Sequence, residues 1–529
     1  MGLSLAILAP QRPPLTHPAL QSFLDSTVLS LQDWGISPRH RVAAVLPNGP
    51  EAATAFLAFS RCSAFAPLNP GYTQRDFDFY LGDLKAAALL VPAGHEGPAI
   101  ASARAREIPL IRLATEPDEP AGLFRLQMEA AVKSVPETEA SAALLLHTSG
   151  TTSRPKLVPL STANLEASAR NIARTLGLTP GDRCLNIMPL FHIHGLMAAV
   201  LASISSGASV VCTDGVYGNR FFDWLEEFKP TWYTAVPTMH QAILAKSPQN
   251  AALLRALKLR FLRSSSASLA PALMQQLEEA FQAPLIEAYG MTEAAHQMAS
   301  NPLPPSARKP GSVGPAAGPE IAIMDESGRL LACGERGEVV IRGANVTAGY
   351  LDNPEANLTA FVDGWFRTGD QGYLDADGYL HLSGRLKEII NRGGEKISPR
   401  EIDEIMLTHP RVRQALAFAV PHVQLGEEVG VAIELKPGSA VSESELRRFA
   451  AGCLPAFKVP KVIRILDEIP KGPTGKLQRI GLSARLGIEA LDEAGRRAPF
   501  IEPRSETERV LAEIWRRVLG VERAGAEDT

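Results

Sequence analysis

The segment LLLHTSGTTSRPKLVPLS, residues 144–161, places hydroxyl side chains, a glycine and two cations directly after an apolar run. Gly150 and Lys156 stand at the spacing of a Walker A loop. However, Pro155 replaces its second glycine and Leu157 replaces the hydroxyl that would bind Mg²⁺, so the segment is not a P-loop of the NTPase type. The groups that still suit an anion are the backbone N–H groups of residues 150–153, the hydroxyls of Thr148, Ser149, Thr151 and Thr152, and Lys156. A solvated surface loop is the alternative for this peptide taken alone.

The bulk properties exclude several classes of protein. A chain of 529 residues with 45% hydrophobic content divides into more than one domain, and a net charge of −4 gives no reason to expect nucleic acid. The five cysteines lack the spacing of a zinc site or a disulfide framework, which suits a reducing cytoplasm. No segment approaches the ~18 uncharged apolar residues of a membrane helix. We therefore predict a soluble cytoplasmic protein with no membrane partner.

The pattern along the chain predicts the elements that must position this chemistry. From about residue 42 to about residue 340, short apolar runs alternate with helical patterns such as 164–177 and 272–281, which indicates parallel sheets covered by helices on both faces. Near Lys387 a compact βα pattern begins. We predict an α/β fold, with a large N-terminal multi-sheet domain over 1–386, a small C-terminal α+β domain over 387–487, a linker over 488–502 and a terminal segment over 503–529.

Five segments in this order resemble the core motifs of the adenylate-forming superfamily, which contains acyl-CoA synthetases, peptide-synthetase adenylation domains and luciferases. They are TSGTTSRPK (148–156), EAYGMTE (287–293), GWFRTGD (364–370), GRLKEIINRGGEKISP (384–399) and PKGPTGK (470–476). Together with PLFHIHG and RSSSASLAP, they are most similar to oxalate-CoA ligase-like members. Ser153 and Leu157 depart from the usual glycines of the first motif.

The resemblance implies ATP and Mg²⁺ as cofactors. The first loop would hold the β and γ phosphates, Lys476 would reach the α phosphate and the acyl carboxylate, and Glu293 would bind Mg²⁺. With Thr148, Lys156 and His192, these are the expected catalytic residues. The attacking carboxylate is already ionised at pH 7, so the step requires alignment and neutralisation of charge rather than a general base. Taken alone, Lys476 would be a surface lysine and Glu293 a helix-start carboxylate.

Further nucleotide contacts follow from the same motifs. Tyr289 is expected to stack on adenine, Thr292 to touch the α phosphate, Asp370 to accept both ribose hydroxyls and Arg385 to contact the same sugar. The remaining expected contacts are Ser266, Ala267, Ser268, Glu287, Ala288, Gly290, Met291 and Leu382. The alternatives are a core aromatic at Tyr289, a turn aspartate at Asp370 and a structural ion pair at Arg385.

The second half-reaction brings a thiol to the acyl adenylate. Members of the superfamily rotate the small, mobile domain about a hinge, which the motif places at Lys387, and Gly393 and Gly394 would then line the path of the pantetheine arm. A simple strand turn is the alternative for this glycine pair.

The acid is inferred from what the pocket lacks. Amino-acid-activating members carry an aspartate for the substrate ammonium, whereas this chain has PLFHIHGL at that place. The expected pocket contains His192, His194, Ser264, Ser265, Gly290 and His296, which favours a small polar acid such as oxalate, a 2-oxo acid or a hydroxy acid over a fatty acid. Each histidine has a core residue as its alternative.

The terminal helix pattern, residues 506–520, resembles the first helix of a carrier-protein domain. We therefore expect an adenylation domain that loads the phosphopantetheine thiol of a downstream carrier protein. Three alternatives stay open: a stand-alone acyl-CoA ligase of the oxalate-CoA ligase type, a luciferase-type oxygenase, and a catalytically silent nucleotide-binding module.

Overall fold

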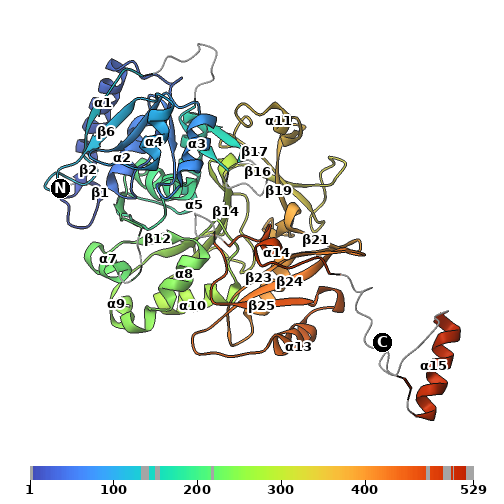
Figure 1. The fold of residues 1–529 in the computed structure, drawn as a ribbon. Helices are drawn as coiled ribbons and strands as arrows, with labels where there is room; N and C mark the ends of the chain where they lie inside the picture. Colours follow the sequence, from blue (N-terminus) through green and yellow to red (C-terminus); the bar gives the residue numbers. More distant parts are fainter. Residues whose placement is uncertain are drawn as a thin grey trace. The chain divides into compact units, whose positions relative to one another are not determined.

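The apolar runs of the N-terminal part form the strands of two mainly parallel sheets. The computed structural model describes residues 4–132, 142–148, 155–215, 218, 220–471, 477–491, 502–503 and 505–519 (Figure 1). The chain divides into a large unit, Met1–Lys387 with Pro470–Gln478, and a small unit, Glu388–Ile469 with Arg479–Thr529.

The first sheet of the large unit has seven strands in the order β7-β6-β5-β3-β4-β8-β9. Neighbours from β6 to β8 are parallel, and the edge strands β7 and β9 are antiparallel to them. The strands are β3 (Arg41–Ala44), β4 (Ala64–Pro67), β5 (Ala88–Pro92), β6 (Leu110–Ala114), β7 (Arg125–Met128), β8 (Leu144–His147) and β9 (Leu157–Leu160).

The second sheet has eight strands in the order β15-β14-β13-β12-β10-β11-β1-β2, again parallel in the middle and antiparallel at both edges. The strands are β1 (Leu5–Leu8), β2 (Leu15–Thr16), β10 (Arg183–Asn186), β11 (Ser209–Cys212), β12 (Trp232–Ala235), β13 (Phe261–Ser264), β14 (Leu285–Met291) and β15 (His296–Ser300).

Helices cover both faces of these sheets, as the alternating pattern predicted. One group shares the hydrophobic core between the two sheets: α1 (His17–Asp33), α2 (Pro50–Phe59), α5 (Thr162–Thr175), the π-helix η1 (His194–Leu201) and α6 (Ala202–Ser205). The outer face of the first sheet packs on α3 (Gln74–Asp83) and α4 (Pro98–Ala105). The outer face of the second packs on α7 (Arg220–Phe228), α8 (Pro237–Leu244), η2 (Ser247–Asn250), α9 (Ala251–Ala256) and α10 (Pro271–Phe281). Figure 1 shows α7 to α10 grouped together, away from α3 and α4.

A third sheet of the large unit is antiparallel throughout, which the alternating pattern did not predict. Its last three strands follow one another through short turns, which antiparallel pairing permits, whereas longer connections, one of them containing a helix, join the first three. The five strands are β16 (Glu320–Met324), β17 (Gly337–Arg342), β18 (Phe361–Val362), β19 (Trp365–Leu374) and β20 (Leu380–Arg385), accompanied by α11 (Pro354–Ala360) and η4 (Leu386–Glu388). The short helix η3 (Thr292–Ala294) lies between β14 and β15 of the second sheet.

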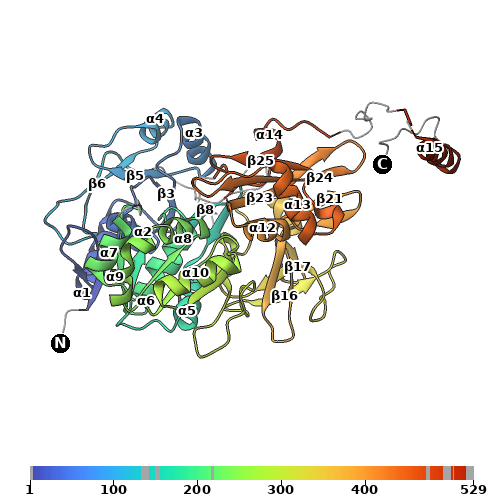
Figure 2. The same ribbon diagram turned by 90° about the horizontal axis from the view of Figure 1, so that it is seen from below.

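The small unit is a mixed sheet packed against helices, in agreement with the predicted α+β class. Its strands are β21 (Ile390–Arg392), β22 (Glu395–Ile397), β23 (Val412–His422), β24 (Gly426–Leu435) and β25 (Val462–Leu466). Its helices are α12 (Pro399–Leu407), α13 (Glu443–Cys453), η5 (Ala456–Lys458), α14 (Leu482–Arg485) and α15 (Glu506–Leu519). Figure 2 shows α12 and α13 beside β23 and β24, where they share one core.

Two features concern the C-terminal segments. Leu491, which falls in the expected linker, donates its N–H to Pro421 and accepts one from Val423, so the end of β23 binds this part of the chain. The predicted terminal helix is α15, and four of its large apolar side chains are exposed: Val510, Leu511, Ile514 and Trp515. Among the described residues, no helix is long and apolar enough to cross a membrane.

Candidate active site

The predicted phosphate loop is closed at its neck by two hydrogen bonds. It joins β8 to β9, and the N–H of Thr148 donates to the carbonyl oxygen of Lys156 at 2.8 Å. In return, the N–H of Lys156 donates to Oγ1 of Thr148 at 3.1 Å. The loop therefore starts and ends at one fixed point. Four of its predicted anion ligands, Ser149, Gly150, Thr151 and Thr152, lie outside the described residues, as does Lys476.

Lys156 and Glu293 meet at a shared tyrosine that sequence analysis missed. The Nζ of Lys156 lies 4.3 Å from the ring centroid of Tyr350, and the hydroxyl of Tyr350 donates to Oε1 of Glu293 at 3.0 Å. Burial raises the pKa of the Glu293 carboxyl, and burial together with the charge of Lys387 lowers the pKa of Lys156.

The same carboxylate fits the expected Mg²⁺ ion. Among the described residues there is no group of three or more His, Cys, Asp or Glu side chains that would hold a metal by itself. Mg²⁺ is commonly held by one or two carboxylates with the substrate's phosphates and water. Glu293, buried beside the loop that carries Lys156, is the carboxylate that would hold it.

Asp370 is held between an aromatic hydroxyl and a guanidinium. Asp370 and Arg385 are opposite each other on β19 and β20, and Nε of Arg385 lies 3.2 Å from Oδ1 of Asp370. The hydroxyl of Tyr289 donates to the other oxygen, Oδ2. Burial and the charge of Asp370 raise the pKa of Tyr289, so this hydroxyl stays protonated. The structure thus brings together three residues expected at the nucleoside. Leu382 lies on β20 opposite Gly372.

The strand that carries EAYGMTE ends in an irregular turn. The register of β14 against β15 shifts between Tyr289 and Gly290, and a Cβ at Gly290 would lie 1.7 Å from the carbonyl oxygen of His296. Only glycine permits this approach. Ala295 and His296 have φ angles of 47° and 96°, a region that non-glycine residues rarely occupy and that is found repeatedly at functional sites.

Glu287 holds the predicted small-residue loop that follows β13. Its Oε1 accepts the N–H of Leu269 at 3.2 Å, and Ser266 in this loop has a φ of 73°. Ala267 and Ser268 are exposed at its tip, whereas Oγ of Ser266 turns inward and lies 3.1 Å from Nδ1 of His194. The remaining predicted contacts near this strand differ in exposure: Ala288 is buried, and Met291 and Thr292 are half-buried.

A buried arginine lies beside the predicted acid pocket, and sequence analysis did not select it. Arg263 has 0% exposure, and its guanidinium contacts Oε1 of Gln297 at 3.3 Å and Nε2 of His194 at 3.4 Å. Among the described residues no carboxylate pairs with it and its Nε makes no hydrogen bond. Burial lowers the pKa of Arg263 to about 10, so the group is still charged at pH 7. The available signal was a cation within the short strand Phe261–Ser264.

One histidine contacts this arginine, a second histidine stacks on the first, and two serines follow the arginine in the sequence. The rings of His194 and His296 stack with centroids 4.8 Å apart, and Oγ1 of Thr234 lies 2.6 Å from Nε2 of His194. An arginine only donates, so its contact with Nε2 indicates a neutral His194 with the proton on Nδ1. Ser264 and Ser265 are fully buried, and their hydroxyls have no hydrogen-bond partner in the described part of the chain.

His192 has a different position from His194. Its Nδ1 accepts the N–H of His194 at 3.3 Å, so the half-buried ring of His192 precedes the first turn of η1. π-Helical turns are rare and often occur at functional sites. This turn fixes both histidines relative to each other.

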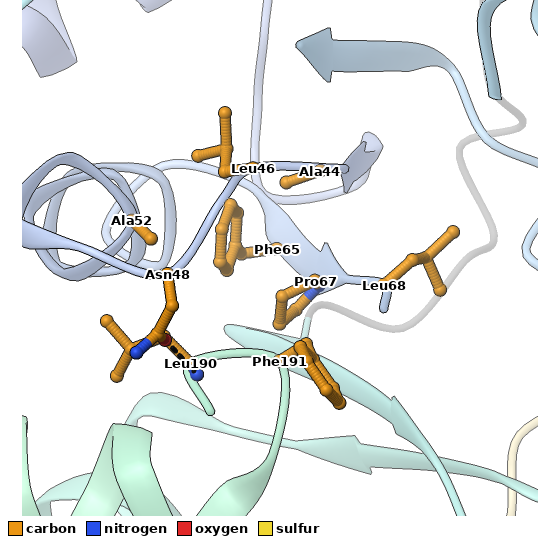
Figure 3. A pocket seen from close by; sticks show the side chains of 9 residues that line it. All are labelled: Ala44, Leu46, Asn48, Ala52, Phe65, Pro67, Leu68, Leu190 and Phe191. Atoms are coloured by element: carbon orange, nitrogen blue, oxygen red, sulfur yellow. Dashed lines mark hydrogen bonds between the residues drawn. The ribbon is translucent and has the colours of Figure 1, made fainter. Parts of the chain in front are cut away.

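Two adjoining hollows lie next to these residues in the large unit. One is lined by the nine residues drawn in Figure 3, where Leu190 donates its N–H to Asn48 at 2.8 Å. The other shares Pro67, Leu68 and Phe191 with it and is also lined by Asn69, Tyr72, Tyr80, Leu146 and His147. Phe191 precedes His192, and His147 precedes Thr148. The hollows therefore adjoin both the predicted acid pocket and the phosphate loop.

The predicted hinge and glycine pair lie at the start of the small unit. Lys387 is the last residue before the chain enters that unit. Gly393 and Gly394 have φ angles of 57° and 96° and form the turn between β21 and β22, and Gly393 donates its N–H to Leu425 at 2.9 Å. The turn itself accounts for both glycines, so a role beside pantetheine stays a prediction.

Known proteins share both the sequence and the fold. A family model for AMP-binding enzymes matches residues 15–351, and one for the C-terminal domain of AMP-binding enzymes matches residues 401–476. Oxalate–CoA ligase of Arabidopsis thaliana is 46% identical over 478 residues, 88% of this chain and 92% of that protein. Oxalate–CoA ligase of Saccharomyces cerevisiae is 42% identical over 470 residues, 83% and 85% of the two chains. The crystal structure of ATP-bound MatB from Rhodopseudomonas palustris matches with a TM-score of 0.81 and 27% identity, covering 91% of this chain and 95% of that one.

Proposed function

Because the chain belongs to the family of AMP-binding enzymes and is a carboxylate-adenylating acid–thiol ligase, we propose that it joins a small dicarboxylate of oxalate's size to coenzyme A, with ATP as the energy source. The observation that carries the choice of acid is Arg263. It is a fully buried cation, and in the described part of the chain its guanidinium has neutral partners: Gln297, Thr234 and His194.

A second carboxylate supplies what this arginine lacks. An uncompensated charge in a protein interior is costly, and a carboxylate that enters the pocket removes this cost while forming a charge-assisted hydrogen bond. The hydroxyls of Ser264 and Ser265 offer further donors close by in the sequence. A monocarboxylate of the same size leaves Arg263 unpaired, and a fatty acid buries methylene groups against it. The pocket therefore selects for two carboxylates close together.

The first half-reaction attaches one carboxylate to the α phosphate of ATP. In this proposal Lys156 and the loop neck at Thr148 hold the phosphates, Glu293 holds Mg²⁺, and Lys476 neutralises the charge that develops between the two reacting anions. Asp370 and Arg385 hold the ribose, since a carboxylate accepts hydrogen bonds from two vicinal hydroxyls. No general base takes part, because the attacking oxygen is already ionised.

The second half-reaction transfers the acyl group to the thiol. In this proposal the thiol approaches within the large unit along the two hollows shown in part in Figure 3, whose walls combine apolar and aromatic side chains with the amide of Asn48. Such walls suit a pantetheine arm, which alternates methylene groups with amides. In this proposal the arm passes Phe191, and the thiol reaches the acyl adenylate beside His192.

The test is an acid panel with purified protein, ATP, Mg²⁺ and CoA. We expect oxalate to give the highest kcat/KM, measured as acid-dependent pyrophosphate release, with oxalyl-CoA identified by mass spectrometry. Malonate and glyoxylate test the length of the acid and the second carboxylate, and leucine and palmitate represent the excluded classes. A panel in which glyoxylate, leucine or palmitate turns over better than oxalate contradicts the proposal.

A second candidate acceptor is a phosphopantetheine thiol on a carrier protein. The observation that favours it is α15, which lies beyond the segments matched by both family models and exposes Val510, Leu511, Ile514 and Trp515. The relatives named above are CoA ligases, which favours free CoA as the acceptor. Competition between CoA and a pantetheinylated carrier for the same acyl adenylate distinguishes the two acceptors. An acyl group found only on CoA excludes the carrier.

A further inference from the structure

The chain passes between the two units at three points, and two of them adjoin predicted catalytic elements. It enters the small unit at Glu388, directly after the predicted hinge residue Lys387, and enters it again at Arg479. Lys476 stands three residues before Arg479 in the sequence. Covalent geometry alone keeps the Cα atoms of residues 476 and 479 within about 11 Å of each other.

Arg479 connects these two entry points within the small unit. Its Nε lies 3.2 Å from Oε2 of Glu388, and one terminal nitrogen lies 2.7 Å from Oδ2 of Asp403 on α12. The other terminal nitrogen donates to the carbonyl oxygen of Ala417 on β23. The N–H of Ala417 donates to Oδ1 of Asp403 at 2.5 Å, so the aspartate is fixed as well. One guanidinium thus joins the start of the unit, a helix and a strand of its sheet.

The three charged side chains of this cluster are largely buried, so the loss of one partner is costly. The side chains of Arg479 and Asp403 are each 14% exposed, and that of Glu388 is 23% exposed. Half-buried charges at these distances are weakly screened by salt and lose more when a partner is removed than surface ion pairs do. A lysine cannot replace the arginine, because a single ammonium does not make the planar, forked contacts of a guanidinium with three partners.

We propose that Arg479 is a positioning residue for the adenylation half-reaction, because it fixes the chain that follows Lys476 to the residue that follows the hinge. This inference depends on the roles proposed above for Lys476 and Lys387. Any rotation about Lys387 then carries residues 388 and 479 together as one rigid group. The orientation of Lys476 is in this way coupled to the orientation of the small unit.

The test separates the two half-reactions in three variants. Adenylation is measured as oxalate-dependent exchange of pyrophosphate into ATP, and thioester formation as the conversion of supplied oxalyl adenylate and CoA. Arg479→Lys should lower kcat of adenylation at least about tenfold with little change in the KM for ATP, because small displacements of a catalytic group are costly. Glu388→Gln, which leaves the Arg479–Asp403 pair in place, should act in the same direction and less strongly. Thioester formation should change less than about threefold in both.

Glu401→Gln is the matched control. It breaks a pair of similar length on the same helix, Lys458 Nζ to Glu401 Oε2 at 2.7 Å, away from the entry points, and should leave both half-reactions unchanged. Thermal unfolding of each variant reports on folding. If Arg479→Lys does not fold, the result with Glu388→Gln tests the proposal instead. Equal losses in both half-reactions, or no loss in either, overturn the proposal.

Lys476→Ala measured in parallel separates this inference from the proposed function. If that variant still adenylates oxalate normally, the role of Lys476 and the inference fail together. If Lys476→Ala loses adenylation while Glu388→Gln and Arg479→Lys behave like Glu401→Gln, the proposed function stands and only the positioning role of Arg479 is overturned.

Discussion

The guanidinium of Arg263 lies 3.3 Å from the amide oxygen of Gln297, a neutral partner in a fully buried site. The amide nitrogen of Gln297 donates to Oγ1 of Thr175 and to the carbonyl oxygen of Ala317, at 3.1 and 3.0 Å. These two bonds turn its oxygen toward the arginine. Gln297 therefore orients Arg263 without neutralising its charge, which leaves the charge for a ligand.

Arg263→Met should abolish the preference for a dicarboxylate. The change keeps much of the side-chain volume and removes a charge-assisted contact worth about 3 kcal/mol, which corresponds to roughly a 100-fold loss in kcat/KM for oxalate. Activity with acetate, low in the wild type, should change far less. The ratio of the two kcat/KM values is the measurement, since a folding defect lowers both alike. Arg255→Gln, on an exposed face of α9, is the control. An unchanged ratio would show that Arg263 has only a structural role.

Glu293→Gln should weaken the binding of Mg²⁺ at the active site. The amide still accepts the Tyr350 hydroxyl but is a poorer ligand for a hard cation. We expect the Mg²⁺ concentration for half-maximal adenylation to rise about tenfold or more, which is ~1.4 kcal/mol in binding. Glu355→Gln, exposed on α11, should not shift it. A Mg²⁺ titration that is identical for wild type and Glu293→Gln contradicts the assignment.

Lys387→Pro should separate the two half-reactions in the opposite sense to the Lys476 variant. Proline fixes φ near −65° and so restricts rotation at this residue, while the contacts of the large-unit site are retained. Pyrophosphate release in the first turnover should persist while formation of oxalyl-CoA fails. Single-turnover measurements of both products test this, and normal rates for both would move the hinge to another residue.

His240→Gln should flatten the pH dependence of stability. Burial lowers the pKa of His240 from 6.5 to about 4. The unfolded chain therefore binds this proton more tightly, and the stabilisation present above pH 6.5 is lost as the pH falls toward 4. By pH 5 the loss is about 2 kcal/mol in the free energy of unfolding.

Denaturant unfolding at pH 7 and pH 5 measures that difference in both proteins. Tyr233 and the carbonyl oxygen of Arg263 bind the two ring nitrogens of His240, so a constant cost at both pH values is expected in the variant as well. The prediction concerns only the change between the two pH values. The exposed His95 serves as control through His95→Gln. An equal change in wild type and His240→Gln contradicts the assignment.

Local sequence patterns were sufficient to predict much of the fold and part of the site of this protein. The periodicities of residues 164–177 and 272–281 predicted α5 and α10, and the alternation of apolar runs and helices predicted parallel sheets covered on both faces. The motifs also named Tyr289, Asp370 and Arg385 as members of one site, because their order along the chain resembles that of a known family. Periodicity and motif order are properties of neighbouring residues, so a sequence displays them directly.

Contacts between distant segments were decided only by the tertiary structure. Tyr289 and Asp370 are 81 residues apart, and Arg263 meets His194 across 69 residues and Gln297 across 34. A cation within a strand does not by itself single out Arg263, since an arginine near the end of a strand is usually solvated. Only its complete burial beside neutral partners makes it a candidate for binding an anion. The antiparallel third sheet and the Arg479 cluster have the same origin. Their partners are selected by packing over the whole unit, a condition that the spacing of residues in a sequence does not express.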